Sequence, residues 1–128
     1  MSELLQEPRH FCALGAQQTV IAIERAIPIL HAGPGCSSKL SAGMAGCGGY
    51  QGTGYAGGDA IPCSNMTERD VVFGGEKRLR NLIESTLKII DGDFFVVLTG
   101  CTSDIIGDDV GSIVSDFQKQ GVPIVYAE

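Results

Sequence analysis

Residues 94–101 have the sequence FFVVLTGC, and this segment decides the fold of the chain. Its first five residues are all apolar, and a continuous apolar run of this length is typical of a parallel strand buried on both faces. Thr99, Gly100 and Cys101 then end the run in a short turn that contains glycine. The segment therefore predicts a buried parallel strand with a thiol just beyond its carboxyl end.

The segments on either side of this strand predict helices and a further strand. Before it, apolar residues recur at helical spacing over residues 76–90. After it, Asp108 and Asp109 open another helix, and residues 122–126 form another apolar strand. Strands joined by helices pair in parallel through right-handed crossovers. We therefore expect an α/β fold with a parallel, Rossmann-like βαβ sheet.

The N-terminal part of the chain has a similar pattern. Residues 13–26 carry an imperfect helical stripe that Pro28 should stop, and residues 27–31 suit a buried strand. Residues 33–35 are Gly-Pro-Gly, which predicts a tight turn, and Cys36 follows directly. A second strand therefore ends in a glycine-containing turn with a thiol.

The middle of the chain is rich in glycine. Ten of the 18 glycines lie between residues 33 and 58, so residues 43–58 are expected to form a loop. No phosphate-loop motif ends this loop, which argues against nucleotide binding. Residues 67–70, Thr-Glu-Arg-Asp, then form a capping box at a helix start.

Length and charge limit the possible functions. The 128 residues suit a single domain, 1–128, and a doubly wound protein would continue beyond the last strand. We therefore expect the N-terminal fragment of a larger doubly wound protein. The net charge of −6, without a basic block, argues against nucleic acid or an anionic membrane as partner. No apolar run suggests a membrane span or a signal peptide, so a cytoplasmic location is expected.

Three of the five cysteines occupy equivalent places. Cys36 and Cys101 each follow a buried strand, and ligands of open parallel sheets bind outside the carboxyl ends of strands. Cys12 precedes a predicted helix, whose N-terminus stabilises the metal-binding thiolate. The cysteines are far apart in the sequence, which excludes local zinc-ribbon and ferredoxin patterns. Three soft thiolates suit an iron–sulfur cluster, whose fourth ligand would come from a partner chain, another residue type or solvent.

Four segments resemble the nitrogenase component 1 family, in particular its β-type subunits and the related cofactor-scaffold subunits. The first cluster turn of the family resembles Cys12-Ala-Leu-Gly-Ala, and the second resembles His31-Ala-Gly-Pro-Gly-Cys. The third resembles the segment from Gly100 to Asp109, which contains Cys101 near its start and ends in Ile-Gly-Asp-Asp at residues 106–109. Residues 65–75, with the sequence NMTERDVVFGG, match the segment before the long helix.

This resemblance implies an oxidoreductase subunit that acts within a larger complex. Three cysteines from each of two homologous subunits would hold a cluster at their interface, either a 4Fe–4S cluster or an 8Fe–7S P-cluster. The complex would be a homodimer, a heterodimer or a tetramer. An ATP-dependent iron protein would supply electrons, which pass through the cluster to a catalytic metal cofactor that reduces dinitrogen or a related substrate. The fragment alone would not be active.

The remaining candidate residues are interpreted more simply. Gly33, Gly35 and Gly100 would let the backbone approach the cluster and donate amides to its sulfurs. Cys63 matches no ligand position and is interpreted as an interior residue, with metal ligation as the alternative. Cys47, in the glycine-rich loop, is interpreted in the same way, and His31 as a hydrogen-bonded residue at a strand end.

Two alternatives stay open at this point. The chain would also suit a non-catalytic scaffold for the assembly of the nitrogenase cofactor, which carries a cluster but reduces no substrate. A metal-free α/β domain with buried thiols is the third possibility. Iron in the anaerobically purified protein distinguishes this last possibility from the other two.

Overall fold

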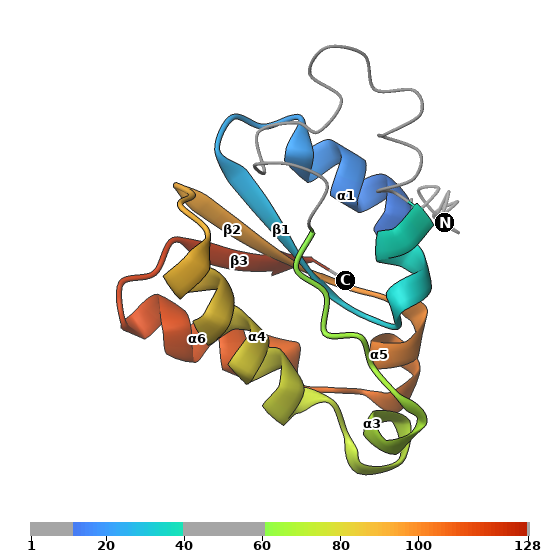
Figure 1. Cartoon of the computed structure of the whole chain (residues 1–128). Coiled ribbons are helices and arrows are strands. Elements are labelled where there is room, and N and C mark those ends of the chain that lie inside the picture. The colour runs from blue at the N-terminus through green and yellow to red at the C-terminus, as the bar shows by residue number, and fades with distance from the viewer. Residues whose placement is uncertain (1–11, 40–60, 128) are drawn as a thin grey trace, which may run out of the picture.

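The computed structural model describes residues 12–39 and 61–127. Three strands form its sheet in the order β1-β2-β3, and both pairs are parallel. The strands are β1 (Ala26–His31), β2 (Phe94–Thr99) and β3 (Ile124–Ala127). The predicted parallel α/β sheet is therefore confirmed (Figure 1). The predicted glycine-rich loop and Cys47 lie outside the described residues.

Helices cover both faces of the sheet. They are α1 (Ala13–Ile21), α3 (Glu68–Phe73), α4 (Glu76–Ile89), α5 (Cys101–Ile106) and α6 (Val110–Lys119), and residues 34–39 are also helical. Figure 1 shows α1 on one face of the sheet and α4 and α6 on the other. The short helices α3 and α5 lie beyond the end at which β1 and β2 finish.

The larger part of the core lies between the sheet and helices α4 and α6. Leu79 and Ile83 of α4 are completely buried there, next to Ile29 and Val97 of the sheet. Full burial of such a side chain contributes about 1.5–3 kcal/mol each. The helical stripe predicted for residues 76–90 therefore faces the core, and it holds the strand ends in fixed positions.

Pro28 lies inside β1 without disrupting the sheet. On the outer edge of this strand, Leu30 N donates to Pro62 O at 2.8 Å, and Ser64 N donates to Leu30 O at 2.9 Å. Pro28 is two residues before Leu30, so its missing N–H would also face this outer edge and not β2. Residues 62–66 thus run alongside β1, and they bring Cys63 next to Leu30.

Two local predictions for the N-terminal part are wrong. The first helix ends at Ile21 and not at residue 26, because Ala26 already pairs with Phe94 in the sheet. Arg25, with a φ of 55°, makes the sharp turn between them, and its side chain pairs with Asp93 at 2.9 Å. A tight turn was predicted over residues 33–35, but a helix already begins at residue 34 and extends to 39, since proline is well suited to a first helical turn.

Helix α5 was also not predicted. It has only six residues and begins directly after β2, so its sequence offers little helical periodicity. Its start is held by Ser103, whose Oγ accepts from Gly100 N at 3.0 Å and donates to His31 O at 2.7 Å. The start of α5 is thereby bound to the end of β1.

None of the helices in the described part of the chain is long and apolar enough to span a membrane.

Candidate metal centre at the carboxyl edge of the sheet

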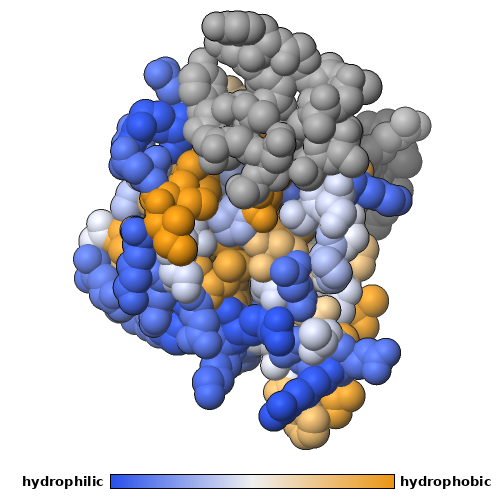
Figure 2. Space-filling model, in the orientation of Figure 1, coloured by the Kyte–Doolittle hydropathy of each residue, from blue (hydrophilic) through white to orange (hydrophobic). Residues whose placement is uncertain are grey.

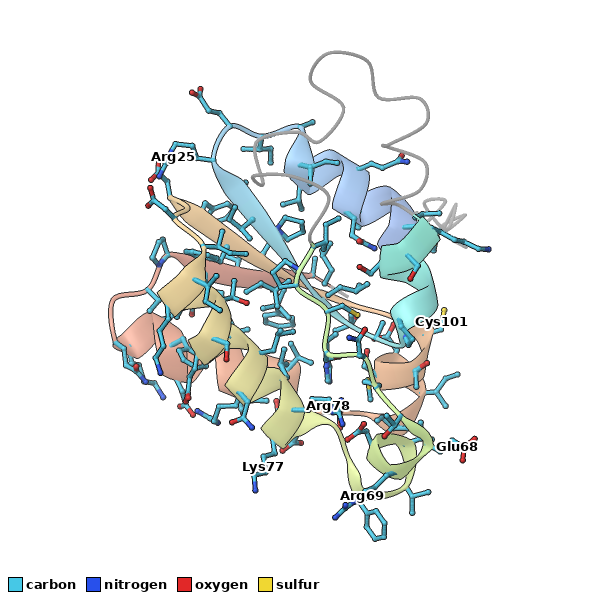
Figure 3. All side chains as sticks on the ribbon, in the orientation of Figure 1. Arg25, Glu68, Arg69, Lys77, Arg78 and Cys101 are labelled. Carbon is cyan, nitrogen blue, oxygen red and sulfur yellow. The ribbon has the colours of Figure 1, made fainter. Side chains whose placement is uncertain are left out.

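The three predicted ligands each lie at the beginning of a helix. Cys12 is the N-cap of α1, and Cys101 is the first residue of α5. Cys36 is in the first turn of the helix over residues 34–39. All three helix starts lie on the side of the molecule where β1 and β2 end (Figure 1), and Figure 3 shows Cys101 close below the start of the helix over 34–39. Free backbone amides at helix starts favour anions, and thiolates are anions.

Cys12 has the clearest thiolate environment. Hydrogen bonds from the backbone amides of Gly15 and Leu14 lower the pKa of its thiol, and the charge of Lys39 adds to this effect. The side chain is exposed to solvent. Cys12 is therefore accessible from outside the chain, in surroundings that favour its thiolate.

Cys36 and Cys63 form a second, more buried environment. Both are half-buried and pack against the same apolar cluster, which includes Leu30 and Ala32. Burial raises the pKa of the Cys63 thiol, and the nearby Cys36 raises it further. Cys63 therefore lies beside a predicted ligand, but in surroundings that disfavour its thiolate.

These environments predict different reactivities for the iron-free protein. At pH 7, Cys12 should react with iodoacetamide faster than Cys63, because it is exposed and its thiol pKa is lowered while that of Cys63 is raised. The ratio of the rates should fall as the pH rises past both pKa values, since both thiols are then ionised. Mass spectrometry of timed alkylation measures both rates, and faster labelling of Cys63 at pH 7 would contradict the prediction.

The three predicted glycines differ in how closely they are packed. A Cβ at Gly100 would lie 2.5 Å from Ala32 Cβ, so this turn passes directly over the end of β1. At Gly33 and Gly35, a Cβ would meet no atom of the described residues within 4 Å. Space beside Gly33 and Gly35 is what a bound cluster would need, whereas Gly100 is required by the packing of the chain itself.

Replacing Gly100 by alanine should therefore lower the free energy of unfolding by about 1–3 kcal/mol, the usual cost of overpacking. The ends of β1 and β2 would have to separate to accept the extra methyl group. Gly33→Ala is the matched control, and it should change stability by less than about 0.5 kcal/mol. Urea unfolding of the iron-free full-length subunit compares the two, and equal stabilities would show that Gly100 is not closely packed.

Next to these turns lies a buried polar network. His31 is completely buried, its Nε2 donates to Asp108 Oδ2 at 2.8 Å, and its Nδ1 lies 3.0 Å from Ser64 Oγ. Both carboxylate oxygens of Asp108 also accept from Gly75 N at 3.0 Å. The prediction that His31 is hydrogen-bonded at a strand end is confirmed. Asp109 caps α6 by accepting from Ser112 N, whereas Asp108 was wrongly predicted to serve only the helix start.

The sequence did not identify this network in advance. Ser64, His31 and Asp108 are far apart in the chain, and only the fold brings them together. The one available signal was a second aspartate before α6, since a single aspartate is enough to cap a helix.

The described residues alone do not bring the three thiols together into a complete site. Among the residues 12–39 and 61–127, no three side chains of His, Cys, Asp or Glu are grouped closely enough to hold a metal ion. Their common edge, their helix starts and the exposure of Cys12 and Cys101 nevertheless fit thiolates that are completed by groups from outside the chain. The donor set is chemically suited to iron and sulfide.

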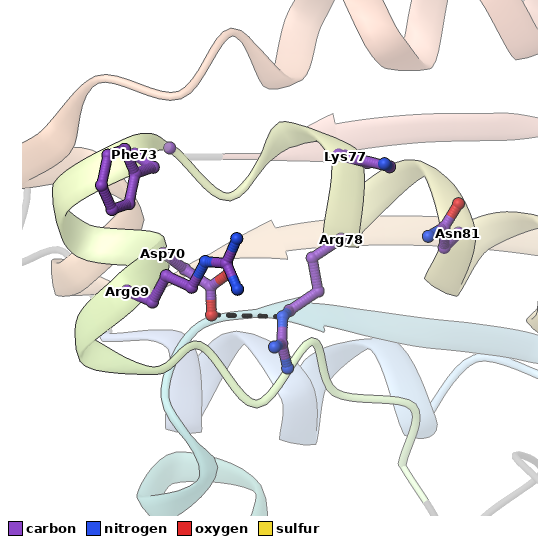
Figure 4. A pocket seen from close by; sticks show the side chains of 7 residues that line it. Arg69, Asp70, Phe73, Lys77, Arg78 and Asn81 are labelled. Atoms are coloured by element: carbon purple, nitrogen blue, oxygen red, sulfur yellow. Dashed lines mark ion pairs between the residues drawn. The ribbon is translucent and has the colours of Figure 1, made fainter.

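A separate groove of about 490 Å³ lies between α3 and the start of α4. Arg69, Phe73 and Lys77 line it (Figure 4). Arg78 crosses it to pair with Asp70 at 3.2 Å. Asp70 also accepts from Thr67 N at 2.7 Å, which confirms the predicted capping box. Phe73 and the adjacent Val72 are 80% and 73% exposed, and Figure 2 shows apolar side chains at the lower edge of the molecule, where α3 lies.

Comparison with known protein families agrees with this geometry. The family model described as nitrogenase component 1 type oxidoreductase matches residues 12–128, which include all three helix-start cysteines. The chain belongs to this family. It represents the N-terminal region of a nitrogenase component 1 protein, as the resemblance of its cysteine turns predicted.

The chain matches only part of the length of its relatives in the component 1 family. The chain is 33% identical to the nitrogenase molybdenum-iron protein beta chain of Methanococcus maripaludis over 101 residues, which are 79% of this chain and 20% of the relative. It is 35% identical to the corresponding alpha chain of Methanosarcina barkeri over 66 residues, 51% of this chain and 12% of that relative. The solved structure named Nitrogenase Cp1 at pH 5 superposes with a TM-score of 0.71 at 25% identity, covering 91% of this chain and 24% of that one. The component 1 chain described here thus spans about a fifth of its curated beta-chain relatives.

Proposed function

We propose that this chain is the cluster-binding part of a nitrogenase-type oxidoreductase subunit. In this proposal, Cys12, Cys36 and Cys101 bind an iron–sulfur cluster of the 4Fe–4S or 8Fe–7S type. The observation that carries it is the placement of three thiols, distant in the sequence, at three helix starts on one edge of a parallel sheet. When bound, the cluster would supply a site that accepts and releases electrons.

The residues of the chain would bind the cluster and stabilise the charge of its thiolate ligands. Backbone amides at the helix starts would stabilise the negative charge of the thiolates, as they do for Cys12. None of the described residues lies within 4 Å of a Cβ placed at Gly33 or Gly35, so a bulky group could lie beside this backbone. Hydrogen bonds from this backbone to cluster sulfurs would adjust the reduction potential.

A homologous subunit would complete the cluster site. Cys12 and Cys101 are exposed, and Ile105, one helical turn after Cys101, is 84% exposed. An exposed apolar side chain next to an exposed thiol favours burial against another protein surface. Relatives of this chain include both alpha and beta chains, which agrees with a partner of the same family.

The groove beside α3 is suited to the electron donor. Phe73 and the cationic Arg69 and Lys77 line it, and the exposed Val72 lies next to Phe73, on a chain whose net charge is −6. Apolar side chains with nearby charges are typical of a transient protein interface. We assign this surface to the ATP-dependent iron protein.

Anaerobic purification of the full-length subunit with its partner tests the proposal. The complex should be brown, contain iron and acid-labile sulfide, and give an electron paramagnetic resonance signal in at least one oxidation state. Colourless, iron-free protein would support the metal-free α/β domain. A cluster without substrate reduction in the presence of its iron protein would identify a cofactor-assembly scaffold.

A further inference from the structure

A small polar pocket lies on the side of β2 that faces α4 and α6, at the carboxyl end of the strand. Its volume is about 170 Å³, which is enough for several water molecules. The pocket is lined by Thr99, Ser103, Asp104, Gly107 and Asp108. None of the described residues that line it is cationic, although two of them are aspartates.

Thr99 provides an oxygen that no group of the described chain uses. The residue is 92% buried, and Oγ1 has no hydrogen-bond partner among the described residues. It follows Phe95 and Val97 along β2 with the alternation of a strand, so it lies on the same face as His31 and Asp108. A buried hydroxyl without a partner costs free energy, and such a group at a polar pocket indicates a missing ligand.

Asp108 provides a carboxylate with remaining capacity. It accepts from Gly75 N and from His31 Nε2, and an ionised carboxylate has about four acceptor positions. Its side chain is only 4% exposed. Asp104 adds a second carboxylate from the solvent side of the pocket. The pocket thus combines two anionic groups and a neutral hydroxyl oxygen.

We propose that this pocket binds one hard divalent cation of the Mg²⁺ or Mn²⁺ class. Asp104, Asp108 and the hydroxyl of Thr99 supply the protein oxygens, and water completes the coordination. Mg²⁺ usually retains several waters and takes only one or two carboxylates, which suits a pocket of this size and composition. Oxygen ligands also distinguish this site from the sulfur ligands of Cys12, Cys36 and Cys101, so the proposal does not depend on the cluster.

Binding of Mn²⁺ to the full-length subunit tests this proposal. Equilibrium dialysis, with free Mn²⁺ measured by its electron paramagnetic resonance signal, gives the number and affinity of the sites. Asp104→Asn removes the negative charge of one proposed ligand, and Thr99→Val removes the oxygen of another, while both keep the shape of the side chain. Asp116→Asn is the matched control, since Asp116 of α6 pairs with Arg80 of α4 and does not line the pocket.

The expected result is a site that both pocket variants weaken and the control leaves unchanged. Loss of an outer-shell partner already lowers metal affinity about 10–100-fold, so loss of a direct ligand should lower it by at least about tenfold. Mg²⁺ should displace the bound Mn²⁺ in the wild-type protein. Absence of any Mn²⁺ site that responds to both variants, or an effect of Asp104→Asn without one of Thr99→Val, would overturn the proposal.

Discussion

Replacing Cys36 by alanine should remove or alter the iron–sulfur cluster of the full-length complex. Cys36 is half-buried, whereas Cys12 and Cys101 are exposed, and it lies at the start of the helix that follows β1. A cluster that loses one of three thiolates from this subunit would keep an open coordination position, and the iron would be released or exchanged. Iron content and the electron paramagnetic resonance spectrum measure the effect.

Cys63→Ala is the matched control for this experiment. Cys63 is half-buried beside Cys36 and packs against the same apolar cluster, so the two substitutions have similar effects on packing. The control should retain its iron. Unchanged iron content in Cys36→Ala would refute the ligand assignment, and iron loss in Cys63→Ala alone would make Cys63 the ligand.

Asp108→Ala should cause the largest loss of stability of any single substitution proposed for this chain. It leaves His31 Nε2 and Gly75 N buried without their acceptor, and it disconnects β1 from the starts of α4 and α6. Each buried donor left without its acceptor costs about 1–3 kcal/mol, and this substitution leaves two such donors. Urea unfolding of the iron-free full-length subunit, in buffer without divalent cations, measures this change.

Asp109→Ala separates this effect from the loss of a helix cap. Asp109 is exposed and its carboxylate accepts from Ser112, which caps the helix, so its replacement should cost about 1 kcal/mol. Hydrogen exchange should also be faster at the Gly75 amide in Asp108→Ala than in Asp109→Ala. Similar stability of the two variants would mean that the buried network contributes no more than the cap.

The regular elements of the fold follow well from the sequence. The apolar run of residues 94–98 and the stripe of residues 76–90 predict β2 and α4, because their periodicity is set by burial in the chain itself. The end of α1 was misplaced, because its final residues carry apolar side chains that suit either a helix or a strand. Pairing of Ala26 with Phe94, far along the chain, decides between the two.

Of the candidate site, only the cysteines could be predicted from the sequence. Motif and strand-end position mark Cys12, Cys36 and Cys101, and the structure places all three at helix starts. The helix after Gly33 and the short α5 were missed, since each depends on a start that is fixed by the neighbouring strand. The network of His31, Ser64 and Asp108 depends on contacts between residues that are far apart in the sequence, and no local sequence pattern reveals such contacts.

The hydroxyl of Ser103 bonds to His31 O and Gly100 O at 2.7 and 2.8 Å, so the turn after β2 is held to the end of β1. These two strand ends therefore move together. A redox group bound between these strand ends would gain or lose an electron in surroundings that move little. Fixed dipoles around such a group lower the reorganisation energy of electron transfer. Ser103, which is not a ligand in the proposed site, would in this way influence how fast an electron can pass.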